Sequence, residues 1–386
     1  MSRGPLTGLS VVELTGVGPA PYAVMLLADM GAEVTRVDRI GGPPDEYPLN
    51  PVLDRGRRSI ALDLKRPDGV DLLLRLVARA DVLVESFRPG VAERLGIGPV
   101  PCLAVRPGLV YARMSGWGQS GPLAGAAGHD INYISLTGAL AAIGRAGGPP
   151  QPPLNLVGDF GGGALFLVYG VMCALWAGGG RVVDANVHDG TTSLLAMVQG
   201  LRASGLWSDR RGTNLIDTGC PYYDVYRCAD DGYVAVGSIE RRFYLNLLAG
   251  LGLDGDSDLV AAHREPTRWP ALRTALTAAF ATATRDEWAE LFADADACVT
   301  PVLEPGEAPH APQATARGLY APVPAHAGAA QVTPTPRFAT DPAKVPVAPP
   351  MPARAPRPGE HTKAILAELG VPDEETAALH AAGVVG

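Results

Sequence analysis

A regular alternation of strand-like and helix-like segments over the first 115 residues most constrains the fold of this chain. Residues 9–16 (LSVVELTG) are apolar, and after the turn GVGPAP the apolar residues Val24, Leu27 and Met30 have helical spacing. Residues 33–38 (EVTRVD) indicate a second strand, and further strands are predicted in SIALDLK, DVLVESF and LVYARMSGWG. Such alternation is typical of a parallel sheet with helices on both faces. We therefore predict an α/β fold with a Rossmann-like, doubly wound parallel sheet.

A different pattern in the second half of the chain predicts a smaller α+β domain. A turn signal at residues 230–232 (DDG) separates two strand-like runs, and helical patterns follow in RRFYLNLLAGLGL and RDEWAELFADA. We predict a large domain over 1–200 completed by 330–386, a small domain over 225–310, and linkers at 201–224 and 311–329.

Composition limits the classes of partner. The formal net charge is -8, which argues against nucleic acid or an anionic membrane surface as the main partner. The five cysteines form no CxxC pair and the seven histidines are scattered, so we expect no disulfide framework, no metal site and a reducing, cytoplasmic location. Glu13 interrupts the first apolar run, which therefore does not resemble a signal peptide.

One stretch has the length of a membrane span. Residues 160–180 (FGGGALFLVYGVMCALWAGGG) are almost entirely apolar, but they are rich in glycine at both ends and no cationic residue precedes them. We interpret this stretch as a core helix.

The first turn resembles a dinucleotide-binding fingerprint but departs from it. Gly16 and Gly18 follow a strand, and Asp38 ends the next strand about twenty residues on. The third glycine is replaced by Pro21, and Pro19 removes another N–H donor from the turn that should hold a pyrophosphate. We therefore favour another use for this turn over a nicotinamide cofactor.

Basic residues gather around the second and third predicted strands. Arginine forks match phosphate oxygens, so this cluster indicates either a ligand with several phosphates or a solvated face. Its members are Arg36, Arg39, Arg55, Arg57, Arg58 and Lys65, with Arg88 further along the chain.

Three acidic residues and one histidine stand at the expected starts of helices. Asp130 could cap a helix that begins near Ile131, with His129 at its mouth, and Asp159 precedes the apolar helix. Glu240 follows a strand and precedes another helix. Capping explains each of them, but the glycines at 161–163 would also let a ligand approach Asp159 closely.

Several motifs in order resemble the alpha-methylacyl-CoA racemase family, within the family III CoA-transferase superfamily. They are GPLTGLSVVEL, MGAEVTRVDR, GHDINYIS, PPLNLVGDFGGG, VVDANVHDG, RGTNLIDTGCPYYDVYRCADDGYVAVGSIERRFY, DACVTPVLEPGE and GEHTKAILAELG. No single motif is decisive, but their order and spacing extend over nearly the whole chain.

The resemblance implies inversion at the α-carbon of 2-methylacyl-CoA thioesters through an enolate. His129 and Asp159 match the family's two acid/base residues, and Glu240 matches a residue that orients the histidine. Asp130 and the first backbone N–H groups of its helix would assist at the thioester oxygen. The family also forms interlocked homodimers, so a homodimer is expected and Glu240 could act across it.

The same matching implies a CoA site, with CoA as part of the substrate and no separate cofactor. Arg39 would bind the CoA phosphates, Arg88 would support them, and residues 128–133 would line the thioester. The implied CoA-binding residues are Arg39, Leu62, Asp63, Leu64, Lys65, Arg88, Gly128, Ile131, Asn132 and Tyr133.

Two other functions stay open at this point. Family III CoA-transferases use an aspartate, which we match to Asp159, as a nucleophile, but histidine at 129 and glutamate at 240 favour racemisation. A non-catalytic acyl-CoA-binding homologue is the third possibility. The acyl chain is not readable from the sequence, although Met114, Met197 and Cys220 are candidates for its pocket. The glycine-rich loop at 177–180 and His188 also depart from the family pattern.

Overall fold

The computed structural model describes residues 4–42, 50–323 and 329–386, and the chain divides into two compact units. Apart from residues outside those ranges, unit 1 comprises Met1–Thr137, Leu154–Leu195 and Gln313–Gly386. Unit 2 comprises Gly138–Pro153 and Ala196–Pro312. Within the linker predicted at 311–329, residues 324–328 lie outside the described residues.

Unit 1 is built on a six-stranded sheet in which every neighbouring pair is parallel. The strand order is β3-β2-β1-β4-β5-β6, which is the order of a Rossmann-like sheet, so the predicted parallel α/β architecture is confirmed. The strands are β1 (Ser10–Leu14), β2 (Glu33–Asp38), β3 (Arg57–Ala61), β4 (Val82–Glu85), β5 (Val110–Ser115) and β6 (Arg181–Asn186).

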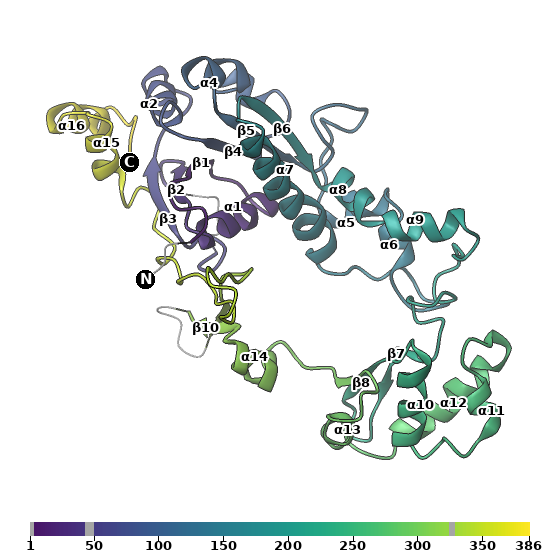
Figure 1. Cartoon of the computed structure of the whole chain (residues 1–386). Helices are drawn as coiled ribbons and strands as arrows, with labels where there is room; N and C mark the ends of the chain where they lie inside the picture. The colour runs from purple at the N-terminus through teal and green to yellow at the C-terminus, as the bar shows by residue number, and fades with distance from the viewer. Residues whose placement is uncertain (1–3, 43–49, 324–328) are drawn as a thin grey trace. The chain divides into compact units, whose positions relative to one another are not determined.

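Both faces of the sheet are buried, which explains why the central strands are apolar without alternation. Val11 and Val110 pack on one face, whereas Val12 and Tyr111 pack on the other. Helices α1 (Pro19–Asp29) and α7 (Leu165–Trp176) cover the first face, and α2 (Pro67–Val77), α4 (Pro99–Val105) and α15 (Thr362–Glu368) cover the second (Figure 1). Unit 1 also contains α3 (Val91–Arg94), α5 (Asp130–Ser135), α8 (Val187–Leu194), α16 (Asp373–Ala381), the pair β10 (Tyr320–Pro322) and β11 (Ala330–Val332), and most of α14 (Pro312–Arg317).

Helix α7 continues a π-helical segment, η1 (Leu156–Ala164). Among the described residues, Leu156–Trp176 is the one helix long and apolar enough to cross a bilayer by length and composition. The expected core helix is buried only along the stripe of Leu167, Val171 and Ala174, which packs against the sheet and α1. A second stripe with spacing of three and four residues is exposed, and it consists of Leu165, Tyr169, Met172 and Trp176.

Unit 2 contains an antiparallel sheet of β7 (Tyr223–Arg227), β8 (Tyr233–Gly237) and β9 (Val299–Pro301). The turn predicted at 230–232 joins β7 to β8, and Asp231 adopts a positive φ of 65° there. The helices of this unit are α6 (Ala139–Ala142), α9 (Ala196–Ala203), α10 (Arg241–Gly250), α11 (Ser257–Ala261), η2 (Pro266–Arg268), α12 (Trp269–Phe280), α13 (Arg285–Phe292) and η3 (Ala308–His310).

Candidate active site

A pocket of about 250 Å³ opens at the carboxyl ends of the parallel strands of unit 1. Its walls come from the segments that directly follow β1, β4, β5 and β6, and from the start of α5 and η1. The chain order in the sheet reverses between β1 and β4, and ligands of open α/β sheets bind beside such a reversal. His129, Asp130, Asp159, Arg88, Gly128 and Tyr133 all line this pocket.

The structure brings His129 and Asp159 to one pocket through a hydrogen bond made by Asp130. His129 is the residue before α5 and its backbone N–H donates to Asn132 Oδ1 at 3.1 Å. Asp130 begins α5, and its Oδ2 accepts the backbone N–H of Asp159 at 2.7 Å. The sequence suggested that Asp130 caps its own helix. The structure shows instead that its carboxylate binds the backbone of η1.

Asp159 carries a perturbed carboxyl group. Burial, together with the negative charge of Asp130, raises its pKa from 3.8 to about 6, although the Asn155 side chain and the charge of His129 oppose this. Burial also raises the pKa of Asp130, against hydrogen bonds from the backbone of residues 158 and 159. A carboxyl group with a pKa near 6 can both hold and release a proton near neutral pH.

The first turn of the sheet is shaped around this carboxyl group. Gly18 has a φ of 72°, and a Cβ atom there would lie 3.5 Å from Asp159 Oδ2. A Cβ atom on Gly16 would lie 2.0 Å from Ser86 Oγ, so this glycine lets the segments after β1 and β4 approach closely. The turn that resembles a dinucleotide fingerprint therefore makes room for Asp159 and for the pocket wall.

Tyr133 forms part of the pocket wall. Its hydroxyl donates to the carbonyl of Gly128, and its ring makes an edge contact with Trp117 at a centroid distance of 4.9 Å. Burial and the charge of Asp159 raise the pKa of Tyr133, and the charge of Arg88 lowers it. Side chains at Gly116 and Gly128 would collide with the tyrosine ring, so both glycines are required for this packing.

The predicted CoA-binding residues differ in where they lie. Arg88, Gly128 and Tyr133 line the pocket. Arg39 follows β2 and residues 62–65 follow β3, so they lie at the same edge of the sheet as the pocket. Arg39, Lys65 and Arg88 are exposed, whereas Leu62 is buried and Asp63 and Leu64 are half-buried. Ile131 and Asn132 lie on α5 but do not line the pocket.

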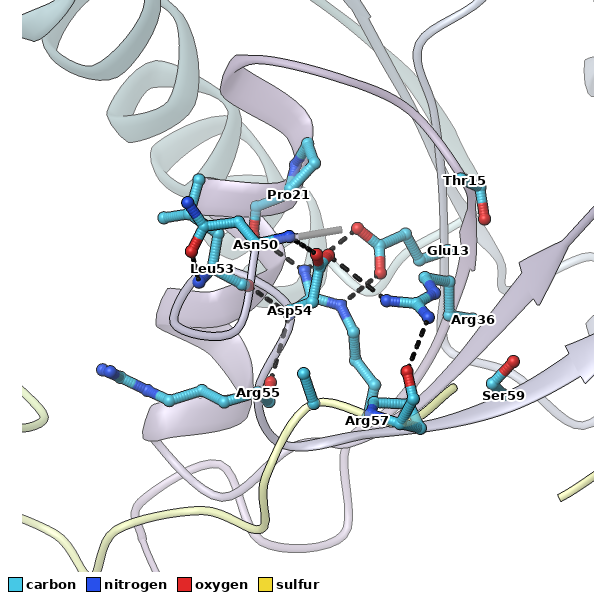
Figure 2. Close-up of polar contacts among 12 residues, drawn as sticks. Glu13, Thr15, Pro21, Arg36, Asn50, Leu53, Asp54, Arg55, Arg57 and Ser59 are labelled. Atoms are coloured by element: carbon cyan, nitrogen blue, oxygen red, sulfur yellow. Dashed lines mark hydrogen bonds and ion pairs between the residues drawn. The ribbon is translucent and has the colours of Figure 1, made fainter. Parts of the chain in front are cut away.

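The hypothesis that the whole arginine cluster binds phosphate is wrong for its buried members. Arg57 donates to both carboxylate oxygens of Glu13, at 2.5 and 3.0 Å, and to the carbonyl of Pro21 (Figure 2). Arg36 pairs with Asp38 at 2.9 Å and with Asp54 at 3.2 Å. Arg55 pairs in the same way with Asp29. All three guanidinium groups are used inside the fold and are closed to solvent, and the half-buried Arg58 is held by Glu368.

Among the other predicted residues, Glu240 and Cys220 lie in unit 2, and His188 lies in unit 1 outside the pocket lining. Glu240 is exposed at the position before α10. Cys220 is fully buried in the core of unit 2, where burial raises the pKa of its thiol to about 11. His188 is the second residue of α8, and its ring lies 5.9 Å from that of Trp117.

Sequence reasoning missed several wall residues, among them Ser86 and Trp117, because their only signal is their position after predicted strands. Within 4–42, 50–323 and 329–386, no group of three histidine, cysteine or acidic side chains is placed to hold a metal ion.

The fold and the pocket together define an α/β protein with a pocket lined by a histidine and two aspartates at the carboxyl edge of its sheet. Residues 6–362 match CoA-transferase family III, and the chain belongs to this family. It is 44% identical to alpha-methylacyl-CoA racemase of Mus musculus over 98% of this chain and 97% of that protein. It is 43% identical to the Homo sapiens protein of the same name over 96% and 94% of the two chains. The crystal structure of a CaiB/BaiF family protein from Brucella suis superposes with a TM-score of 0.80 at 25% identity, covering 95% of this chain and all of the other.

Proposed function

We propose that this protein is a racemase or epimerase that inverts the α-carbon of 2-methylacyl-CoA thioesters. The observation that carries the proposal is that one pocket contains both His129 and an Asp159 carboxyl whose pKa is raised to about 6. The identity of 43–44% to two proteins named alpha-methylacyl-CoA racemase supports the same reaction class.

In this mechanism two groups exchange one proton each with opposite faces of the substrate carbon. The His129 imidazole removes the α-proton of one enantiomer, and the electron pair of the C–H bond moves into the thioester to form an enolate. The Asp159 carboxyl then gives its own proton to the other face, and the enolate collapses to the inverted thioester. The reverse reaction starts from the Asp159 carboxylate and a protonated His129. Glu240, from its own subunit or a partner, would orient the imidazole.

The enolate oxygen requires hydrogen-bond donors. The backbone N–H of Asp130, the first residue of α5, is the expected donor, because the N–H groups of His129 and Asn132 already bond to Asn132 Oδ1 and to the His129 carbonyl. Arg88 lines the same pocket. We propose that it supports the CoA phosphates together with Arg39 and Lys65, and that residues 62–64 contact the adenine end.

We also propose that the protein is a homodimer. The exposed stripe of α7 supports this proposal, because Trp176 is 94% exposed and Tyr169 is 67% exposed. Contiguous exposed apolar side chains of this kind are typical of protein or membrane contacts. A second copy is the occupant that the racemase assignment favours, since dimers are the expected state of that family.

Heavy-water incubation with a single enantiomer of 2-methylacyl-CoA tests the reaction. We expect deuterium at the α-carbon together with loss of optical purity. Transfer of CoA to an added free acid would instead indicate a transferase in which Asp159 is the nucleophile. Binding of the thioester without either reaction would indicate a non-catalytic homologue, and both results would overturn the racemase proposal.

A further inference from the structure

The two proposed acid/base groups are joined by a single side chain. His129 and Asp130 are neighbours at the start of α5, whereas Asp159 lies in η1, 29 residues later. The hydrogen bond from the Asp159 backbone N–H to Asp130 Oδ2, at 2.7 Å, connects these two elements inside the pocket.

The glycine before Asp159 is required for this connection. A Cβ atom on Gly158 would lie 2.2 Å from Asp130 Oδ2 and 2.7 Å from Ile134 Cγ2. Gly158 is buried and its φ is not positive, so its backbone would accept alanine and only the close approach of α5 excludes it. The Asp130 carboxylate and the bare backbone of Gly158 are therefore complementary in shape as well as in hydrogen bonding.

We propose that Asp130 is the positioning residue of the acid/base pair, because its carboxylate fixes the turn that carries Asp159 against the helix start that carries His129. The negative charge of that carboxylate also opposes ionisation of the Asp159 carboxyl. This inference rests on the proposed function and specifies how the second proton donor of the pocket is prepared. A displacement of about 1 Å in such a pair can cost about a hundredfold in rate, so one hydrogen bond at this place has a large effect.

The electrostatic part of the proposal depends on which groups face Asp159. From α5 these are Asp130, His129 and Tyr133, and from η1 itself the Asn155 side chain. Arg88, which follows β4, lowers the pKa of Tyr133 through its charge. The segment before α1 presents Gly18 to the Asp159 carboxyl. From α8, Val187 and Thr191 face the glycines of η1. Asp130 is therefore the negative charge that acts on Asp159, and it is also the largest influence on its pKa after burial.

Asp130→Asn separates the two roles of the residue. The asparagine carbonyl can still accept the Asp159 N–H, but the negative charge is gone. The titration of Asp159, followed by carbon NMR of protein labelled in its aspartate carboxyls and assigned with Asp159→Asn, should move down by about one pH unit. Asp68→Asn makes the same charge change on the exposed first turn of α2 and should leave that titration in place.

Asp130→Ala removes the hydrogen bond as well as the charge. We expect its kcat to fall by about ten- to a hundredfold, and that of Asp130→Asn to fall clearly less. Gly158→Ala should lower kcat about as much as Asp130→Ala does. Gly200→Ala should leave kcat unchanged, because the added methyl group meets no atom within 4 Å. An unchanged Asp159 titration in Asp130→Asn, or equal kcat in Asp130→Ala and wild type, overturns the proposal. Because the titration needs no substrate, it can succeed even if the racemase assignment fails.

Discussion

At the scale of single residues, the raised pKa of Asp159 has a cost in stability. The native carboxyl has a pKa of about 6, against 3.8 for the ordinary group, so between these values the native state binds more protons than the unfolded state. The contribution of Asp159 to the free energy of unfolding therefore falls as the pH rises from about 4 to about 6. Functional residues commonly lower stability in this way.

Asp159→Asn should accordingly stabilise the protein while abolishing its activity. The neutral amide removes the penalty of a buried charge, so we expect the free energy of unfolding at pH 8 to rise by about 1–2 kcal/mol, after allowance for partial exposure of the group. Near pH 4 the variant and wild type should differ little. Urea unfolding at both pH values measures this, and a variant less stable than wild type at pH 8 would contradict the burial argument.

Individual residues also show how much of the candidate site could be predicted from the sequence. His129 and Asp159 were singled out from motifs that resemble a family, and the structure places both in one pocket. The partner of Asp130 could not be predicted, because a hydrogen bond between residues 130 and 159 depends on tertiary packing. Trp117 carried no signal for the same reason. Arg36 and Arg57 were misinterpreted, because a sequence gives the charge of a side chain but not its burial.

At the scale of elements, β3 shows how neighbouring arginines can differ. Arg57 points into the fold and is paired with Glu13, whereas Arg58 points outward to Glu368 with its side chain 40% exposed. Successive side chains of a strand face opposite sides of the sheet, which produces this difference. The alternation of strands and helices was predictable, because the spacing of apolar residues is a local property of the sequence. The ion-pair partner of each arginine was not, because it lies far away along the chain.

Arg57→Met should be much more damaging than Arg58→Met. Loss of Arg57 leaves Glu13 buried without its cation, and we expect a loss of about 3–5 kcal/mol in the free energy of unfolding. Loss of Arg58 should cost less than about 1 kcal/mol, because exposed pairs contribute little. Thermal and urea unfolding measure both. If Arg57→Met does not fold, the double variant with Glu13→Gln should restore folding, and failure of that rescue would contradict the role of the pair.

The position of Arg39 at the carboxyl edge of the sheet leads to a prediction about substrate binding. Arg39 directly follows β2 at this edge, and its guanidinium forms no ion pair with any of the described residues. Arg39→Ala should raise KM for CoA esters by about tenfold with little change in kcat, because the phosphates bind equally in the ground and transition states. Arg58→Ala is the matched control, since its guanidinium is held by Glu368. Unchanged KM in Arg39→Ala would exclude it from the phosphate site.

At the scale of the whole molecule, helix α7 is apolar on two sides but packs its own chain on only one. Leu167, Val171 and Ala174 are buried in unit 1, and the opposite stripe leaves Tyr169 and Trp176 in solvent. A helix that is apolar all round is normally buried all round. The sequence could predict the apolar helix but not which stripe remains exposed, since that depends on which stripe packs against the sheet and α1. The exposed stripe is therefore the place to test for a second copy.

The double variant Tyr169→Asp and Trp176→Asp should convert a dimer into monomers. Two carboxylates in an apolar contact would be desolvated without partners, which is strongly unfavourable. Light scattering coupled to size-exclusion chromatography should give the mass of two chains for wild type and of one chain for the variant. Val100→Asp, at a side chain that is 82% exposed on α4, should leave the mass unchanged. A monomeric wild type that binds lipid vesicles through α7 would instead assign the stripe to a membrane, and a variant that remains dimeric would place the interface on another surface.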